Sequence, residues 1–331
     1  MIDDRFSGAL RHAMMDSSAR VYVVTSLERS LSRISLSQSC IRSVVSLLNF
    51  VLDNEYTTSK FVERVNKFRK EWARHLDRVY FRSYEDLRWE CLRRTVFSKV
   101  SRSEIAGCPA VSLGATLDLG CGRGCLSSRL IQTAFASEVV GIDDADFTSE
   151  WNERVSSSTT GTRQAFERVR AAELGQWLKT KKPFDTILLS YVLHHSESHF
   201  VDMTMDALHH GLTSKGQVIV IEDSLVTSTS AAPDEDPLQY FSKWTQWAQE
   251  SQRYALTPAF NAQAILDFVA VKLLAGFDDV VMPCTYRTST DWHTVFDGCG
   301  FEVKQTINIG FPDDRDIDVP QAAFVLQRKR Q

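Results

Sequence analysis

The sequence lacks the paired cysteines that disulfide frameworks and zinc sites need. Seven cysteines are spread over 331 residues, an odd number, and no two have Cys-x-x-Cys spacing. They are Cys40, Cys91, Cys108, Cys121, Cys125, Cys284 and Cys299. This pattern argues against a secreted disulfide-rich fold and against a structural zinc site. It favours a reducing compartment, which we expect to be the cytoplasm.

Long apolar runs and a strong charge bias are missing as well. The longest apolar stretch, residues 44–52, is interrupted by Ser46 and Asn49, and it is much shorter than the roughly 20 residues of a membrane span. The first residues include Asp3 and Asp4 and no apolar segment, so no signal peptide is predicted. A net charge of -4 provides no general attraction to nucleic acid or to anionic membranes. We therefore expect neither as a partner.

Glycine and proline are absent between Ala9 and Ile105. Within this stretch apolar residues recur three and four positions apart, for example Val24, Leu27 and Leu31, which predicts helices over residues 17–106. We interpret residues 1–106 as a helical N-terminal extension. It would serve either as a cap or as an arm through which two chains form a homodimer.

After residue 107 the pattern of apolar residues changes and predicts alternating strands and helices. Strands are predicted at 115–119, 138–142, 184–193, 217–221, 301–309 and 322–327, with helices at 125–135, 201–212 and 289–299. This order predicts an α/β fold, a doubly wound and mostly parallel sheet with helices on both faces. We assign residues 107–224 and 284–331 to this core.

Residues 225–283 interrupt the alternation with a polar loop and two aromatic-rich helical stretches, 238–254 and 259–274. The segment is longer than a normal crossover, which predicts a helical lid or substrate-pocket insertion. Its aromatic side chains suit an enclosed apolar ligand. We expect Tyr240 and Trp244 to bind substrate.

A glycine-rich turn at 116–124 follows the first strand. Gly120, Gly122 and Gly124 permit positive φ angles and close approach of a ligand to the backbone. A dinucleotide site would have GxGxxG spacing and no carboxylate ahead of it, whereas Asp118 precedes Gly120 by two residues. A carboxylate there repels pyrophosphate and attracts a cationic group, so the cofactor indicated is cationic.

Three segments, 118–124, 139–143 and 184–195, together resemble the motifs of class I S-adenosylmethionine (SAM)-dependent methyltransferases of the small-molecule type. The resemblance covers about residues 111–224 and 284–328. It implies a Rossmann-like, seven-stranded sheet, SAM as the cofactor, S-adenosylhomocysteine (SAH) as the product, and no metal. The residues it assigns to the cofactor loop are Asp118, Gly120, Cys121, Gly122 and Gly124.

The resemblance also assigns the rest of the cofactor site. Asp143, closing the second strand, is expected to accept hydrogen bonds from both ribose hydroxyls, and the adjacent Asp144 could replace it. No aspartate stands where relatives carry one for the adenine. Ala171 and Ala172 are therefore the expected neighbours of the ring, and residues 190 and 191 (Ser190, Tyr191) should border the cofactor.

Candidate bases follow the strands that end beside the transferred methyl. They are His195, His194 and the acidic pair at 222–223, of which Asp223 is the preferred acid. We favour His195 over His194, because His194 directly follows Leu193 and is expected to turn into the sheet–helix packing. A metal site built from these histidines is disfavoured, since a strand tail followed by a loop rarely arranges imidazoles tetrahedrally. An amine or an already acidic acceptor would need no base.

Tyr286 and Arg287 open the helix before the sixth strand, and we expect both to contact substrate. Arg287 would meet an acidic substrate group or form an ordinary surface salt bridge. The function predicted is methyl transfer from SAM to a small-molecule acceptor, at a hydroxyl or carboxyl oxygen, by in-line displacement. The alternatives are a protein or tRNA acceptor and a non-catalytic SAM-binding scaffold.

Overall fold

The computed structural model describes residues 4–33, 36–100, 113–157, 163–225, 256–277, 280, 282, 286–310 and 320–329. The chain divides into two compact units. The first, called here the helical unit, holds Met1–Arg88, Ala231–Tyr286 and Gly310–Val319. The second, the sheet unit, holds Trp89–Ser230, Arg287–Ile309 and Pro320–Gln331.

The described elements of the helical unit are all helices. They are α1 (Asp4–Met15), α2 (Ser17–Arg33), α3 (Gln38–Phe50), α4 (Thr58–His75), π-helical η1 (Leu76–Tyr80), most of α5 (Phe81–Leu92), α12 (Leu256–Asp267) and π-helical η6 (Phe268–Leu274). Side-chain caps begin three of them: Asp16 accepts from the Ala19 amide before α2, Ser37 from the Cys40 amide before α3, and Thr57 from the Lys60 amide before α4. Over the described residues 17–33 and 36–100 the predicted helices are present, while 101–106 lie outside the described residues. Helix α1 falls within the predicted helical extension, ahead of the helices assigned from residue 17.

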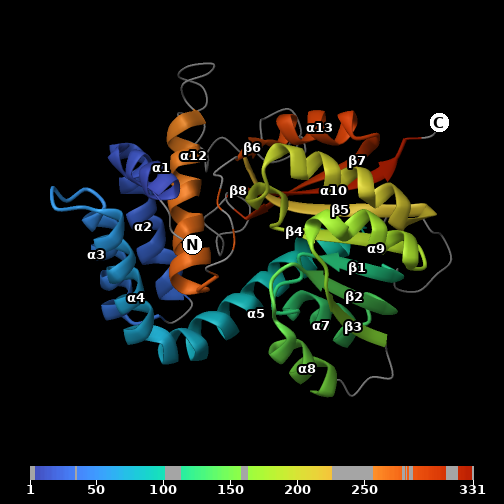
Figure 1. The fold of residues 1–331 in the computed structure, drawn as a ribbon, viewed down its shortest axis with the longest axis horizontal. Coiled ribbons are helices and arrows are strands. Elements are labelled where there is room, and N and C mark those ends of the chain that lie inside the picture. The colour runs from blue at the N-terminus through green and yellow to red at the C-terminus, as the bar shows by residue number, and fades with distance from the viewer. Residues whose placement is uncertain are drawn as a thin grey trace. The chain divides into compact units, whose positions relative to one another are not determined.

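Helix α12 packs against α1 and α2 (Figure 1). The rings of Phe61 and Phe268 lie 5.7 Å apart, and Arg69 Nε donates to the Lys272 carbonyl at 2.9 Å. The later half of the predicted insertion therefore forms one body with the N-terminal helices. The predicted boundaries at 106/107, 224/225 and 283/284, and the lid role, stay predictions.

The sheet unit contains all the described strands. They are β1 (Ala115–Leu119), β2 (Glu138–Asp143), β3 (Arg163–Arg168), β4 (Phe184–Ser190), β5 (Leu212–Leu225), β6 (Arg287–Thr288), β7 (Phe301–Gly310) and β8 (Pro320–Arg328). Their order is β3-β2-β1-β4-β5-β8-β7, with the two-residue β6 beside β5 (Figure 1). The pairs from β3 to β5 are parallel and β8 is antiparallel to β5. The predicted doubly wound, mostly parallel sheet is confirmed, as a seven-stranded path with the short β6 added.

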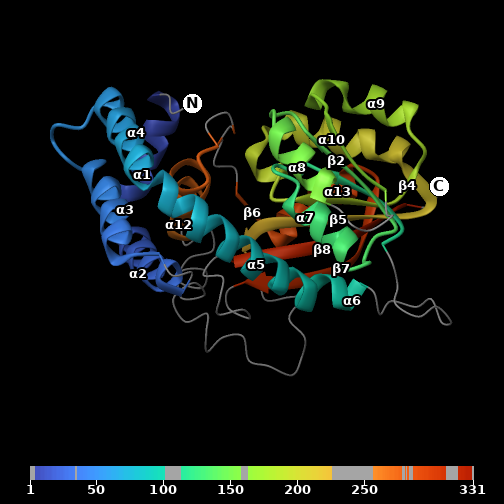
Figure 2. The ribbon, with the colours of Figure 1, turned by 90° about the horizontal axis from the view of Figure 1, so that it is seen from below.

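Helices cover both faces of this sheet. The helical elements are the end of α5, π-helical η2 (Arg93–Phe97), α6 (Ser98–Val100), α7 (Cys125–Gln132), α8 (Thr148–Ser157), the 3-10 turns η3 (Ala171–Glu173) and η4 (Leu193–His195), α9 (Leu174–Thr180), α10 (Ser198–Gly211) and α13 (Ser289–Gly298). Helices α9 and α10 lie on one side of the sheet (Figure 2). Leu117 and Leu119 of β1 belong to a buried cluster shared with α9, α10 and α13. Since side chains alternate along a strand, Asp118 faces the other side, where it contacts Ser127 of α7.

The two strands that end beside the site differ from their predicted lengths. Strand β4 stops at Ser190 rather than Leu193, because Tyr191 takes a left-handed conformation (φ 60°) that cannot continue a strand. Strand β5 runs to Leu225, well beyond the predicted Ile221. No helix among the described residues is both long enough and apolar enough to cross a membrane.

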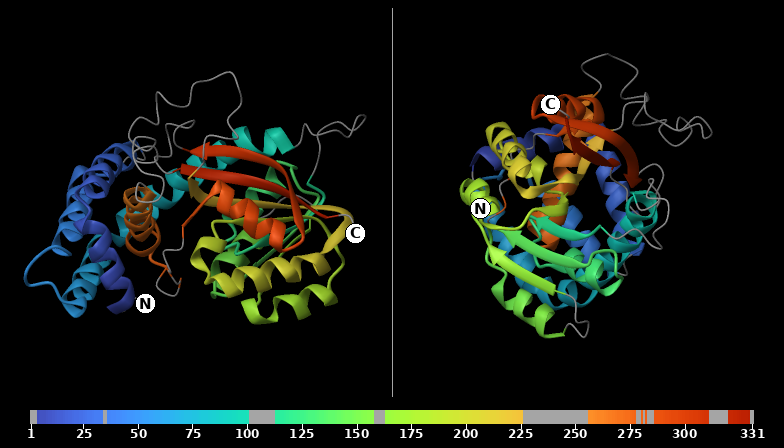
Figure 3. Two further views of the ribbon diagram at one scale, coloured as in Figure 1. Left: turned by 90° about the horizontal axis from the view of Figure 1, so that it is seen from above. Right: turned by 90° about the vertical axis from the view of Figure 1, so that its right-hand side faces the viewer.

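Strand β8, which lies between β5 and β7, gives the first testable prediction. Phe324 of β8 is fully buried and its ring lies 5.3 Å from that of Phe296 on α13. Helix α13 runs beside the red strands β7 and β8 (Figure 3, left). Phe324→Ala should lower the free energy of unfolding by about 3–5 kcal/mol, because a large cavity would remain in the core. Denaturant unfolding measures this, with the half-exposed Phe200→Ala as the matched control. A loss below about 1 kcal/mol for Phe324→Ala would contradict this account of the core.

Candidate active site

Five parallel strands bring their carboxyl ends to one edge of the sheet. In spatial order the residues at or just after these ends are Ala171 after β3, Asp143 of β2, Gly120 after β1, Ser190 of β4 and Glu222 of β5. The strand order reverses between β1 and β4, and open α/β sheets bind ligands at such a switch point. The predicted cofactor and base residues thus come from neighbouring strands of one unit.

The turn after β1 has the backbone that its glycines were expected to permit. Gly120, Gly122 and Gly124 have φ angles of 73°, 52° and 75°. A Cβ on Gly120 would lie 2.4 Å from Val192, so the turns after β1 and β4 touch at the switch point. A Cβ on Gly122 would meet nothing within 4 Å. The turn is therefore packed on one side and open at Gly122.

Asp118 lies beneath the turn rather than at its surface. Its side chain is 1% exposed, and Oδ2 accepts a 2.5 Å hydrogen bond from the Ser127 hydroxyl. That contact joins β1 to the first turns of α7. Burial raises the pKa of the neighbouring Cys121 thiol, and the Asp118 and Asp143 carboxylates raise it further, so Cys121 stays protonated. Direct contact of Asp118 with a cofactor stays a prediction.

Asp143 connects the end of β2 to the glycine turn. Its Oδ2 accepts from the Gly122 amide at 2.8 Å and its Oδ1 from the Ala145 amide at 2.9 Å. Burial raises the pKa of the Asp143 carboxyl, although the hydrogen bonds from the Ala145 and Gly122 amides lower it. Asp144 is exposed, as are Ala171 and Ala172 in η3. The geometry therefore favours Asp143 over Asp144 for a ligand held against the turn.

A chain of three side chains joins the ends of β4, β5 and β8. The Tyr191 hydroxyl donates to Gln321 Oε1 at 2.5 Å, and Gln321 Nε2 donates to Asp223 Oδ1 at 2.9 Å. Gln321 and Asp223 are both buried. Asp223, a predicted base, is thus engaged in a hydrogen-bond chain that holds the Tyr191 ring. The sequence analysis did not identify Gln321, because its antiparallel partner in β5 could not be assigned from the pattern.

Glu222 and His194 form a buried pair at the same edge. Glu222 is 0% exposed and His194 is 2% exposed. Glu222 Oε1 accepts from the amides of Val192 (3.1 Å) and Leu193 (2.7 Å), while Oε2 accepts from the His194 amide (3.3 Å) and contacts His194 Nδ1. His195 is half-buried, with its ring centroid 4.0 Å from that of His194. His194 is turned inward as expected, but toward a carboxylate rather than into apolar packing.

Of the predicted substrate residues, Arg287 is placed at this edge, because β6 pairs with the carboxyl end of β5 beside Ser224. Tyr240 and Trp244 lie outside the described residues. Tyr286 belongs to the helical unit, where its buried hydroxyl donates to Asp267 Oδ2 at 2.9 Å. Arg287 belongs to the sheet unit, donates to Ser198 Oγ at 3.1 Å and lies over the Trp292 ring. Their contacts with substrate stay predictions.

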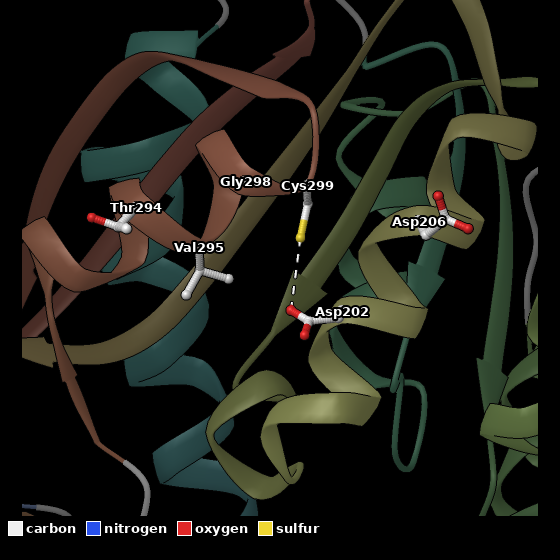
Figure 4. Close-up of a pocket in the computed structure, with 6 residues that line it drawn as sticks. All are labelled: Asp202, Asp206, Thr294, Val295, Gly298 and Cys299. Atoms are coloured by element: carbon white, nitrogen blue, oxygen red, sulfur yellow. Dashed lines mark hydrogen bonds between the residues drawn. The ribbon is translucent and has the colours of Figure 1, made fainter.

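A separate surface pocket of the sheet unit lies between α10 and α13. Its lining residues are Asp202, Asp206, Thr294, Val295, Gly298 and Cys299 (Figure 4). The Cys299 thiol points at Asp202, with an Sγ–Oδ1 distance of 3.9 Å. Burial raises the pKa of this thiol, and Asp202 raises it further. The pocket therefore offers no reactive thiolate, and none of the predicted site residues lines it.

Residues 88–306, more than half of the chain, match a family model described as a methyltransferase domain. The chain belongs to this methyltransferase family. It is a class I SAM-dependent enzyme, as the motifs implied. No curated protein matches the chain.

Several solved structures are similar to the methyltransferase. The mitomycin 7-O-methyltransferase MmcR aligns at 13% identity and a TM-score of 0.45, over 87% of this chain and 67% of that one. The pyocyanin biosynthetic protein PhzM aligns at 14% identity and a TM-score of 0.44; the alignment covers 71% of this chain and only 55% of the PhzM chain. Magnesium protoporphyrin IX methyltransferase (ChlM) from Synechocystis PCC 6803, with bound SAH, aligns at 15% identity and a TM-score of 0.42. That alignment covers 75% of this chain and 88% of the ChlM chain.

The residues at the sheet edge fit SAM. The glycine turn is open at Gly122, where no side chain would meet a ligand. Asp143 provides carboxylate oxygens that can accept from ribose hydroxyls in addition to the amides they already bind. The edge is acidic, with Asp118, Asp143, Glu222 and Asp223 along it, which suits a cofactor with a positively charged sulfur.

Asp143 gives a prediction with a defined pH dependence. Asp143→Ala should weaken SAH binding about tenfold or more, because charge-assisted hydrogen bonds to the ribose are lost. A raised pKa means that the carboxyl gains its proton at a higher pH than an ordinary aspartate. Wild-type affinity should therefore decrease early on acidification, while Asp143→Asn should be weak at neutral pH and nearly independent of pH. Titration calorimetry with SAH measures both.

Asp144, the exposed residue next to Asp143, provides the control for the Asp143 variants. Asp144→Ala should leave the SAH dissociation constant within about twofold of wild type, as expected of a surface substitution. If Asp144→Ala weakens binding and Asp143→Ala does not, the ribose contact belongs to Asp144 and the assignment of Asp143 is wrong.

Proposed function

We propose that the methyltransferase transfers a methyl group from SAM to a hydroxyl or carboxyl oxygen of a small-molecule acceptor, and that His194 accepts the proton when the acceptor is a hydroxyl. The observation that carries this proposal is the buried Glu222–His194 pair at the carboxyl edge of β4 and β5. An imidazole oriented by a carboxylate is the usual arrangement of a general base in enzymes.

The hydrogen bonds of Glu222 define which nitrogen of His194 acts. Three backbone amides donate to its two oxygens, so the side chain serves as an acceptor at each contact. We therefore assign the shared proton to Nδ1 of His194, with Oε2 as its acceptor. In this arrangement a proton taken up by the ring would go to the other ring nitrogen, Nε2.

When bound, SAM supplies a methyl group on a positively charged sulfur, which leaves as a neutral thioether. A hydroxyl is a weak nucleophile until its proton is removed, so His194 Nε2 takes that proton as the new carbon–oxygen bond forms. The resulting imidazolium lies against Glu222, which stabilises its charge. An amine with a free lone pair would gain nothing from this pair, and for that reason oxygen is the proposed acceptor atom.

His195, which the sequence analysis preferred, remains a second candidate for the base. Its ring lies against that of His194. His194 is favoured here because its orienting carboxylate is within the same unit and in direct contact. The kinetics of single substitutions at the two positions distinguish them.

A small acceptor is supported by the chain's acidic balance and by the aromatic composition of residues 238–254. A protein or tRNA acceptor is the alternative within enzymes. Mass spectrometry of the purified chain with SAM and a panel of phenols, carboxylic acids and amines tests the proposal. Methylation of phenols or acids with release of SAH supports it. Methylation of amines alone would overturn it, and SAH binding without turnover on any acceptor would favour a scaffold.

The base makes the third prediction. His194→Ala should lower kcat for a hydroxyl acceptor by about 10²–10⁴, the usual loss for a general base, with SAH affinity unchanged. The loss should become smaller as pH rises, because the acceptor then ionises without help. Steady-state kinetics across a pH series measures it. The exposed His210→Ala on α10 is the matched control and should behave as wild type.

The variant His195→Ala distinguishes His194 from His195 as the general base. A loss of kcat confined to His195→Ala would return the role of base to His195. Wild-type turnover in both variants at neutral pH would assign catalysis to proximity alone and would contradict the proposed base.

A further inference from the structure

We infer that Trp151 and Arg154 of α8 are positioning residues for the cofactor, because they hold successive peptide groups of the glycine turn in place. The inference rests on the use of SAM or SAH at this turn. Neither residue belongs to a recognised motif of the sequence, and neither is needed for the chemistry proposed above.

Trp151 binds the turn through its ring nitrogen. Nε1 donates to the Gly122 carbonyl at 2.8 Å. The indole is held in turn by a parallel stack on Phe166 of β3, with ring centroids 5.6 Å apart and planes inclined by 8°. Phe166 lies directly under the turn, since a Cβ on Gly124 would be 2.5 Å from its ring. The aromatic pair therefore forms a rigid floor from which one donor reaches the backbone.

Arg154, one helical turn further along α8, binds the next carbonyl. Its Nε donates to the Arg123 carbonyl at 2.6 Å, and its Nη2 donates to Cys125 Sγ at the start of α7. A guanidinium can serve two acceptors at once because its donors are fixed in one plane. Arg154 thus joins the end of the turn to the helix that follows it.

These contacts continue the one that Asp143 makes. The peptide group entering Gly122 is held by Asp143, the group leaving Gly122 by Trp151, and the group leaving Arg123 by Arg154. All three side chains come from one chain segment, the end of β2 and α8. A turn held this way keeps its shape without ligand, and binding then loses less free energy to ordering the backbone.

The consequence is a specific effect on cofactor affinity. Each lost hydrogen bond should weaken SAH binding by about threefold to tenfold, the range that a single net hydrogen bond supports. At saturating SAM the turnover number should stay near wild type, because neither side chain acts on the acceptor's proton. A residue that served only the core would instead change the melting temperature and leave the dissociation constant unchanged.

Two variants test this on the full chain. Trp151→Phe keeps an aromatic ring on Phe166 but removes the Nε1 donor, and Arg154→Met keeps the aliphatic stem but removes the guanidinium. The exposed Glu153→Gln on the same helix is the matched control. Calorimetry with SAH gives the dissociation constant, thermal unfolding gives the melting temperature, and hydrogen exchange compares the amides of Gly122 and Gly124 with that of Leu117 in β1.

The expected result for both variants is a weaker SAH affinity by about threefold to tenfold and faster exchange of the turn amides. Exchange at Leu117 and the properties of Glu153→Gln should match wild type. Unchanged SAH affinity in both variants, or faster exchange throughout β1 together with a large fall in melting temperature, would overturn the positioning role. A wild-type chain that binds no SAH would instead refute the proposed function itself.

Discussion

The site is organised around Glu222, a carboxylate with no exposure to solvent. Removing such a group from water costs several kcal/mol unless hydrogen bonds replace its hydration. Three consecutive amides and one imidazole provide that replacement. The chain after β4 must therefore form the tight turn η4, since only a turn presents three successive amides to one carboxylate. The orientation of His194 follows from the same requirement.

Acidic groups recur along the whole carboxyl edge, and each is bound by donors from its own unit. Asp118 binds the Ser127 hydroxyl, Asp143 binds two amides, and Asp223 binds the Gln321 amide. Donors of this kind allow a carboxylate to be buried, yet they leave the local charge negative. A pyrophosphate would be repelled by such an edge, whereas a sulfonium is attracted. The electrostatics of the fold thus agree with a methyltransferase rather than with a dinucleotide enzyme.

The sequence was informative where residue type and spacing report local structure. The glycine turn and most of the parallel strands followed from local patterns, and the resemblance added Asp143 at the end of β2; strand β3 was not predicted. The roles of Glu222 and Gln321 depend on which strands become neighbours, 28 and 130 residues away along the chain from His194 and Tyr191. No local pattern carries that information. The same limit applies to α12, whose packing against α1 and α2 joins segments that are far apart in sequence.

At Tyr191 the apolar pattern predicts a continuing strand, but the backbone of the site turns away from the strand direction there. A non-glycine residue at φ 60° costs on the order of 1 kcal/mol or more, and a periodic apolar strand pattern gives no sign of it. The conformation persists because the Tyr191 amide donates to the Ile221 carbonyl at 2.7 Å while its hydroxyl donates to Gln321. With both ends held, the backbone must leave the strand direction at Tyr191. That departure ends β4 three residues early and turns the next residues toward Glu222. The predicted end of β4 at Leu193 was therefore wrong because of the left-handed conformation of Tyr191, and the same conformation brings His194 to Glu222.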